Sequence, residues 1–223
     1  MNFVTYPDRE ALMIGVAEAM AGELSEALHR EGRASLSVPG GTTPGPVFDI
    51  LSGVPLDWAN VAVFLNDERW VPDDSPRSNT RALRMRLLRD QAAAAELIPL
   101  YANFPTPEEA LSALSYGIAP HLPITVLLLG MGADMHTASL FPGADLLAQA
   151  LAKDAPPLMA LRADAAGEPR ITLTGPVLAE AMHIHILITG TEKRTAVQAA
   201  AHLTPLEAPV RVVLANATVH WAE

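Results

Sequence analysis

The apolar run of residues 124–129 leads directly into a loop that carries two glycines, Gly130 and Gly132. A short apolar run bounded by glycine is typical of a strand buried on both faces of a parallel sheet. In open α/β sheets, ligands bind beyond the C-terminal ends of the strands. The loop after this run also carries a carboxylate, Asp134, and an imidazole, His136. We therefore expect an α/β fold with its functional residues in loops at one edge of the sheet.

Four other segments have the length and β-branched or leucine content of strands, and helical patterns separate most of them. These segments are residues 34–38, 61–65, 183–189 and 210–214. Apolar residues at spacing four from Leu12 to Leu28 predict an amphipathic helix that covers the sheet. We also expect a helix near 145–152 and a short helical turn at 137–140. The alternation predicts a Rossmann-like, mostly parallel sheet with helices on both faces, in a single domain over residues 1–223.

Composition narrows the choice of partners. The chain has 223 residues, half of them hydrophobic, and a formal net charge of −10. A strongly acidic chain is a poor match for nucleic acid, because binding to a phosphate backbone requires a basic face. A small anionic ligand is compatible with this charge where a few cations are concentrated at its site. Since Lys153 and Lys193 are the only lysines, we expect arginine to dominate anion recognition.

The sequence also predicts a location and a chemistry. It has no cysteine, which excludes disulfides, thiolate catalysis and most structural zinc sites. Because no apolar stretch approaches the length of a membrane helix and no signal-like pattern opens the chain, we expect a cytoplasmic protein without membrane contacts. We expect no bound metal, because histidine and carboxylate spacing fits no metal site. We further expect a monomer or a weak homo-oligomer.

The segment after the strand at 34–38 reads Gly40-Gly41-Thr42-Thr43-Pro44. Glycines allow close backbone approach, Thr43 can cap a helix, and Pro44 suits the first helical position. Free N–H groups at such a helix start attract an oxyanion such as phosphate. An ordinary capped turn would have the same sequence, so this motif indicates a phosphate site only together with others.

Charged residues follow the strand at 61–65. Asp67 and Arg69 flank Glu68, and a second arginine, Arg77, stands just before a helix that we expect to begin near Asn79. One interpretation is that an acid orients Arg69 while its guanidinium group meets the substrate. The alternative is a solvated loop with a local salt bridge, which contributes little to stability.

His136 is the best candidate for catalysis, because an imidazole titrates near neutrality and can take and return a proton. Asp134 can orient its ring or bind a substrate hydroxyl. His183 and His185 alternate with isoleucines along a predicted strand, so we expect them to pack or hydrogen-bond on one face of the sheet. Arg170 and Lys193 can each complete an anion site, with Lys193 favoured by its position just after the strand at 183–189.

Taken together, these motifs resemble the 6-phosphogluconolactonase family, within a fold group that includes glucosamine-6-phosphate deaminase and ribose-5-phosphate isomerase. The matching pieces stand in the family's order: Gly-Gly-Thr-Thr-Pro at 40–44, Asp-Glu-Arg-Trp-Val-Pro at 67–72, Ser-Asn at 78–79, the loop at 130–143, Arg-Ile-Thr-Leu-Thr at 170–174, and Gly190 with Lys193. Two positions depart from the family pattern. Met135 replaces the glycine before the histidine, and Ala166-Gly167-Glu168-Pro169 replaces a proline-rich segment.

The resemblance implies hydrolysis of 6-phospho-D-glucono-1,5-lactone in the oxidative pentose phosphate pathway, without a cofactor. It implies catalysis by His136 with Asp134. It also implies that the substrate is bound by Gly40, Gly41, Thr42, Asp67, Arg69, Arg77, Asn79, Gly130, Gly132, Arg170 and Lys193. One alternative is a deaminase-like aldose–ketose isomerase, but the glutamate that such enzymes carry after the histidine is absent from residues 139–143. The other alternative is a phosphosugar sensor without catalysis.

Overall fold

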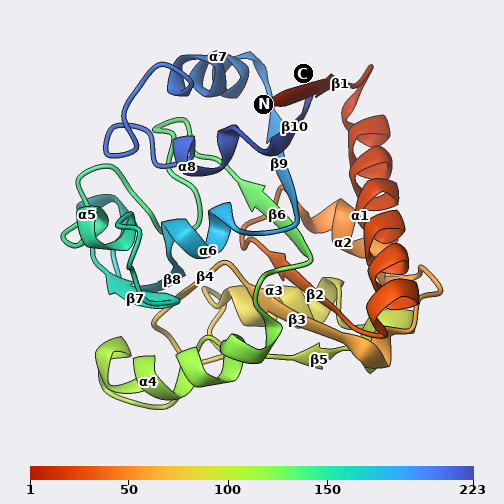
Figure 1. Ribbon diagram of the computed structural model, residues 1–223, viewed down its shortest axis with the longest axis horizontal. Coiled ribbons are helices and arrows are strands. Elements are labelled where there is room, and N and C mark those ends of the chain that lie inside the picture. The colour runs from red at the N-terminus through yellow and green to blue at the C-terminus, as the bar shows by residue number, and fades with distance from the viewer.

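A seven-stranded sheet forms the centre of the protein, and every neighbouring pair of strands in it is parallel. The computed structural model describes residues 1–223, with the side chain of Ala165 left out. Figure 1 shows the strands in the order β1 (Asn2–Thr5), β10 (Ala217–Ala222), β9 (His183–Thr189), β6 (Val126–Gly130), β2 (Ala34–Val38), β3 (Val61–Leu65) and β5 (Glu96–Leu97). Because the strands are parallel, the loops that follow them gather at one edge of the sheet.

A second, smaller sheet is antiparallel, and the sequence did not predict it. It consists of β4 (Asp67–Arg69), β8 (Arg170–Leu173) and β7 (Leu158–Leu161). Its register places Asp67 opposite Thr172 and Arg69 opposite Arg170. Two arginines that are far apart in the chain are therefore neighbours across a strand pair.

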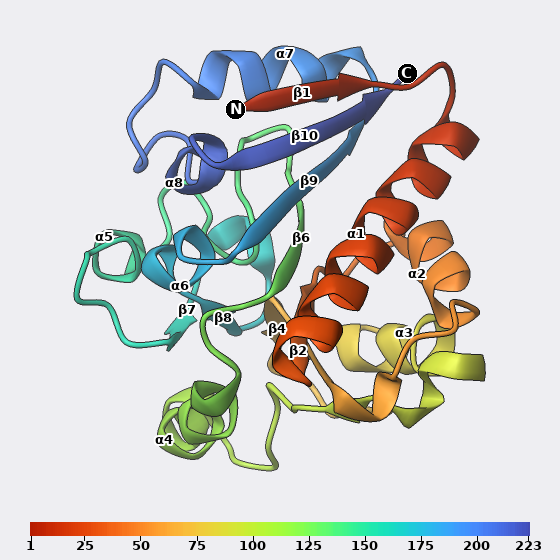
Figure 2. The same ribbon diagram turned by 45° about the vertical axis from the view of Figure 1, so that its right-hand side comes forward.

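Helices cover the central sheet on both sides, with α1 and α2 on one side and α6 and α8 on the other (Figure 2). The helices are α1 (Arg9–Glu31), α2 (Gly45–Ser52), α3 (Asn79–Arg86), α4 (Pro107–Ile118), α5 (Leu147–Ala150), α6 (Gly175–Ala179), α7 (Thr191–Ala200) and α8 (Arg211–Leu214). Asp8 caps α1 by accepting a hydrogen bond from the N–H of Ala11, and Gly32 ends it in the left-handed conformation. The expected apolar face of α1 is buried against the sheet.

The structure confirms the mostly parallel α/β fold and four of the five predicted strands, although β6 begins two residues late. The prediction of a strand at 210–214 was wrong. Val213 and Leu214 are buried in the short helix α8, and the strand that follows it, β10, lies between β9 and the edge strand β1. The five residues Val210-Arg211-Val212-Val213-Leu214 fit one half-buried helical turn as well as a strand, because so short a segment has no period that distinguishes the two. The expected helix at 145–152 is only the single turn α5.

Two further points concern the whole chain. Buried apolar side chains from helices and strands along its length belong to one contiguous core, while the single domain over residues 1–223 stays a prediction. Within the part of the chain that the structure describes, each helix is too short or too polar to traverse a bilayer.

Candidate active site

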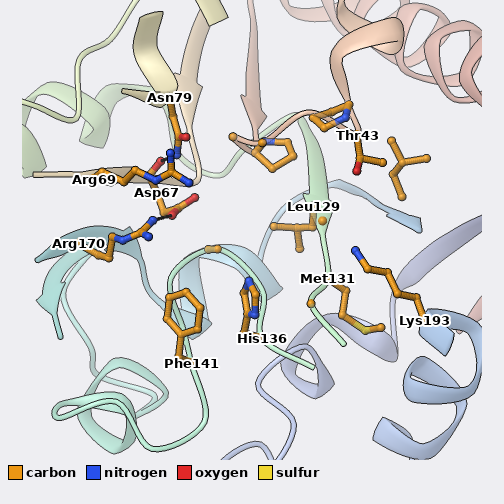
Figure 3. A pocket seen from close by; sticks show the side chains of 18 residues that line it. Thr43, Asp67, Arg69, Asn79, Leu129, Met131, His136, Phe141, Arg170 and Lys193 are labelled. Atoms are coloured by element: carbon orange, nitrogen blue, oxygen red, sulfur yellow. Dashed lines mark hydrogen bonds and ion pairs between the residues drawn. The ribbon is translucent and has the colours of Figure 1, made fainter. Parts of the chain in front are cut away.

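A pocket of about 370 Å³ opens at the C-terminal edge of the central sheet. Its walls come from the turn after β2, from β4 and β8 of the small sheet, from the start of α3, from the loop after β6, and from α7. The lining residues are Pro39, Gly40, Gly41, Thr43, Pro44, Asp67, Arg69, Asn79, Leu129, Gly130, Met131, Gly132, His136, Ala138, Phe141, Arg170, Leu187 and Lys193. Figure 3 shows Arg69, Arg170, Asp67 and Asn79 at one end, Thr43 and Lys193 at the other, and His136 between them.

The turn after β2 lines the pocket, but its helix begins differently from the prediction. Pro44 is the residue before α2, and no side chain caps the helix. Thr43 therefore lines the pocket instead of capping, whereas Thr42 lines a neighbouring hollow that Thr43 also borders. Gly41 has φ of 84°, which favours glycine, and a Cβ atom on Gly40 would lie 2.2 Å from the side chain of Asn79. Gly41 is thus required by its backbone conformation, and Gly40 is required by its close packing against Asn79.

His136 and Asp134 form a hydrogen-bonded pair at the centre of the site. The Nδ1 atom of His136 lies 2.6 Å from Oδ1 of Asp134, and the backbone N–H of His136 donates to the same oxygen at 3.2 Å. With Nδ1 engaged by the carboxylate, Nε2 is the ring nitrogen left for substrate. A Cβ atom on Gly132 would lie 2.2 Å from this Nδ1 atom and 2.3 Å from this Oδ1 atom. Only glycine at position 132 leaves room for the pair.

The backbone around His136 is strained. Met135 has φ of 66° and Ala138 has φ of 49°, in the left-handed region that costs a non-glycine residue about 1–2 kcal/mol. Residues 137–140 form an antiparallel bridge between Thr137 and Leu140, so the expected helical turn was wrong. The hydroxyl of Thr137 donates to the carbonyl of Gly130 at 2.9 Å, which ties the loop back to β6. Strained backbone of this kind is found at functional sites, where the surrounding structure holds it in place.

The small sheet supplies a charged wall. Asp67 and Arg170 are buried with their side chains 3.7 Å apart, and burial lowers the pKa of the Arg170 guanidinium. The Nε atoms of Arg69 and Arg170 are buried without a hydrogen-bond partner among the described residues. Because both arginines line the pocket, their positive charge can attract an anion bound there. The interpretation of residues 67–69 as a solvated loop was wrong, because they form a buried strand.

Arg77 lies outside the pocket. Its side chain is 61% exposed and pairs with Glu168 at 2.5 Å, while its carbonyl accepts a hydrogen bond from Nη1 of Arg69 at 2.8 Å. Arg77 therefore contributes a backbone oxygen that holds Arg69. Thr42, Arg77 and Asp134 are the three residues of the predicted site that do not line the pocket, and Asp134 contacts His136 directly.

Phe141 and Ser139 belong to the site and were missed as individual residues. The ring of Phe141 lies 4.3 Å from the ring of His136. The buried hydroxyl of Ser139 donates to Oδ2 of Asp67 at 2.5 Å, which joins the histidine loop to the charged wall. Both residues stand within the loop singled out in the sequence. The partner of Ser139 is 72 residues away, so spacing gave no signal for it, whereas Phe141 stands only five residues after His136 and could have been noticed.

The remaining histidines of interest lie elsewhere. His183 and His185 both contact Glu23 of α1, at 3.3 and 2.7 Å, which confirms their predicted role on one face of the sheet. His220 is buried between His185 and Tyr6, and its ring contacts both side chains. The described residues include no cluster of three or more histidines and carboxylates with the geometry of a metal site.

The family model "Glucosamine-6-phosphate isomerases/6-phosphogluconolactonase" matches residues 7–221. The chain belongs to this family. It is 41% identical to a 6-phosphogluconolactonase of Mesorhizobium japonicum, an alignment that covers 99% of this chain and 95% of the relative. A crystal structure of a 6-phosphogluconolactonase from Shewanella baltica superposes with a TM-score of 0.96 at 33% identity, covering 100% of this chain and 98% of that one.

The solved structure of a monomeric glucosamine-6-phosphate deaminase has the same fold as this protein. Its TM-score is 0.82 at 17% identity, and the match covers 99% of this chain and 97% of that one. At that identity the likeness concerns the fold alone.

Proposed function

We propose that this protein hydrolyses 6-phospho-D-glucono-1,5-lactone to 6-phospho-D-gluconate. The observation that carries the proposal is the pocket in which His136, paired with Asp134 behind it, stands between two groups of cationic and polar residues. A phosphorylated lactone needs an anion site, a positioned base for water and a stabiliser for the developing oxyanion. The 41% identity to a curated 6-phosphogluconolactonase over nearly the whole chain supports the same function.

Substrate binding uses the residues that line this pocket. The turn at Gly40 and Gly41 offers backbone N–H groups to the phosphate, and basic side chains supply the opposing charge. Lys193 lies at the first turn of α7 and faces the pocket. Binding of the phosphate, which takes no part in the reaction, holds the lactone carbonyl near His136.

Hydrolysis then proceeds by acid–base catalysis. Nε2 of neutral His136 removes a proton from water as the water oxygen bonds to C1, while Asp134 holds the ring through Nδ1. The carbonyl oxygen becomes an oxyanion, which an arginine or loop N–H groups stabilise. Arg69 lines the pocket and Arg77 does not, which favours Arg69 for this contact. The bond between C1 and the ring oxygen breaks, and the imidazolium returns its proton to that oxygen.

The test is lactone consumption by the His136→Ala variant, followed by pH-stat with the spontaneous opening of the lactone subtracted. Loss of a general base costs about two to four powers of ten in rate, so turnover falls by that factor while 6-phosphogluconate still binds. His202→Ala is the control, because His202 is exposed and lies outside the pocket. Unchanged turnover in His136→Ala would refute the assignment.

The lactone assay tests the sensor alternative, and a second assay tests the isomerase alternative. A phosphosugar sensor binds 6-phosphogluconate but leaves the lactone at its spontaneous rate even in the unmodified protein. A deaminase-like isomerase instead releases ammonium from glucosamine 6-phosphate, which a coupled dehydrogenase assay detects. The fold shared with a deaminase makes this second measurement necessary.

A further inference from the structure

Glu68 is a buried carboxylate that takes no part in the proposed chemistry, although both of its neighbours in β4 line the pocket. Its side chain is fully buried, and it lies between Asp67 and Arg69. Successive side chains of a strand point to opposite faces, so Glu68 points away from the pocket when its neighbours point into it. It reaches the start of α3, the helix whose first residue, Asn79, also lines the pocket.

The carboxylate accepts five hydrogen bonds, all from neutral groups. Oε1 accepts from the backbone N–H groups of Arg69 and Asn79, each at 2.8 Å. Oε2 accepts from the N–H of Thr80 at 2.7 Å, from its hydroxyl at 2.8 Å and from the hydroxyl of Ser78 at 3.2 Å. The first N–H groups of a helix have no partner within the helix and carry partial positive charge. Glu68 therefore accepts hydrogen bonds from N–H groups at the start of α3 that have no partner within the helix, and their partial positive charge stabilises the carboxylate.

These bonds join two pieces of the pocket wall that are separate in the chain. The side-chain amide of Asn79 donates to the carbonyl of Asp67 at 3.1 Å. The same side chain packs against Gly40, where an added Cβ atom would come within 2.2 Å. Through Asn79, the carboxylate of Glu68 thus links β4 to the turn after β2.

We propose that Glu68 is a positioning residue that fixes Arg69 and Asn79 for substrate binding. The inference rests on the proposed function, since the substrate that these residues meet is the lactone. A displacement of about 1 Å in a group that positions substrate can cost roughly 100-fold in rate. Glu68 removes that freedom by holding the backbone N–H groups of both residues on one oxygen.

Glu68→Gln is the sharpest perturbation, because it keeps the shape of the side chain and changes only its hydrogen bonding. Both oxygens of Glu68 face at least one backbone N–H, which can only donate. Whichever way the glutamine amide turns, its NH2 group meets such a donor. The hydroxyls of Ser78 and Thr80 can rotate, but the backbone cannot. The variant must therefore move either Arg69 and Asn79 or the start of α3.

We expect Glu68→Gln to lower kcat/KM about 10-fold to 100-fold, mostly through a higher KM, and to weaken 6-phosphogluconate binding in parallel. The pH profile of kcat stays unchanged, because the His136–Asp134 pair lies on another loop. In an Arg69→Ala background, the effect of Glu68→Gln shrinks to a small remainder, since residues that act through one another are not additive. An equal factor in both backgrounds would assign Glu68 to general stability and overturn the proposal.

Glu207→Gln is the matched control. Glu207 also accepts from a backbone N–H and a hydroxyl, both of Thr204, but it is exposed and lies outside the pocket. We expect its kinetics to equal those of the unmodified protein. If Glu68→Gln does not fold, Thr80→Val removes one donor to Oε2 and leaves the backbone intact. It raises KM several-fold, and Thr80→Ser restores it; unchanged KM in Thr80→Val overturns the proposal.

Amide hydrogen exchange tests the same inference without activity. Glu68→Gln accelerates exchange in the segment that contains Arg69, Asn79 and Thr80, and leaves residues 130–141 as they were. If the amides of Arg69 and Asn79 exchange as slowly in Glu68→Gln as in the unmodified protein, the positioning role is overturned, even where the unmodified protein hydrolyses the lactone. If the unmodified protein does not hydrolyse the lactone, the proposed function fails, and the exchange result still decides whether Glu68 fixes this wall.

Discussion

We predict that acid lowers the stability of the folded protein through His220, which belongs to a row of hydrogen-bonded polar side chains beneath α1. His220 is 3% exposed, and its ring lies 2.8 Å from the hydroxyl of Tyr6 and 2.9 Å from the ring of His185. The other nitrogen of His185 lies 2.7 Å from Glu23. Burial, helped by the charge of His185, lowers the pKa of His220 to about 4 from its ordinary 6.5. The folded protein therefore keeps this imidazole neutral where the unfolded chain protonates it.

The sign and the size of the effect follow from that difference. Between pH 6.5 and about 4 the unfolded chain binds more protons at His220, so the free energy of unfolding falls as the pH is lowered through this range. One pKa unit corresponds to about 1.4 kcal/mol, which gives a loss on the order of 3 kcal/mol across this pH range. A typical domain is stable by roughly 5–15 kcal/mol, so this single group removes a large share.

The assay is urea unfolding at about pH 7 and about pH 4.5, followed by circular dichroism. Glutamine at position 220 cannot titrate, so His220→Gln loses less stability between the two pH values than the unmodified protein does, by roughly 2–3 kcal/mol. Any loss of packing in the variant affects both pH values and cancels. His29→Gln, a change at an exposed position of α1, keeps the original pH dependence. Equal losses in His220→Gln and the unmodified protein would refute the reasoning.

Two other predictions concern the loop that carries His136. Asp134→Asn keeps the shape of the side chain but removes the charge that stabilises the imidazolium, so we expect kcat to fall roughly tenfold or more with little change in KM, measured by steady-state hydrolysis. An unchanged kcat would show that Asp134 does not assist the histidine. Met135→Gly and Met135→Ala lose the same side-chain packing, but only alanine keeps the cost of the left-handed backbone at φ 66°. We expect the glycine variant to be more stable than the alanine variant by about 1 kcal/mol in urea unfolding, and the reverse order would disprove the strain.

The histidine loop shows how much the sequence predicts and where it stops. The apolar run before Gly130 predicted a buried parallel strand, and parallel strands place their following loops at one edge. That reasoning correctly brought Gly40, His136 and Lys193 to one pocket. The departure at Met135 was also visible in the sequence, but the structure alone shows that its backbone is left-handed.

For the charged segment after β3, the sequence could not tell a solvated loop from a buried strand. Asp67, Glu68 and Arg69 alternate, so one of the two acids had to face the opposite way from Arg69, but nothing local told whether any face was buried. The antiparallel pairing with β8 decided it, by burying Glu68 and placing Arg170 beside Arg69. Arg77 has the same chemistry as Arg170, yet its loop leaves it on the surface.

The sequence by itself determined the alternation of strands and helices, the edge of the sheet where polar loops gather, and the types of residue available there. These features depend on local period and on short-range turn chemistry, which neighbouring residues specify. The tertiary structure decided which arginines enter the pocket, which carboxylate holds the wall, and that residues 210–214 turn into a helix while β10 completes the sheet. These outcomes depend on pairing between segments that are separated in the chain, such as β4 with β8, which lie about 100 residues apart and whose pairing no local pattern encodes.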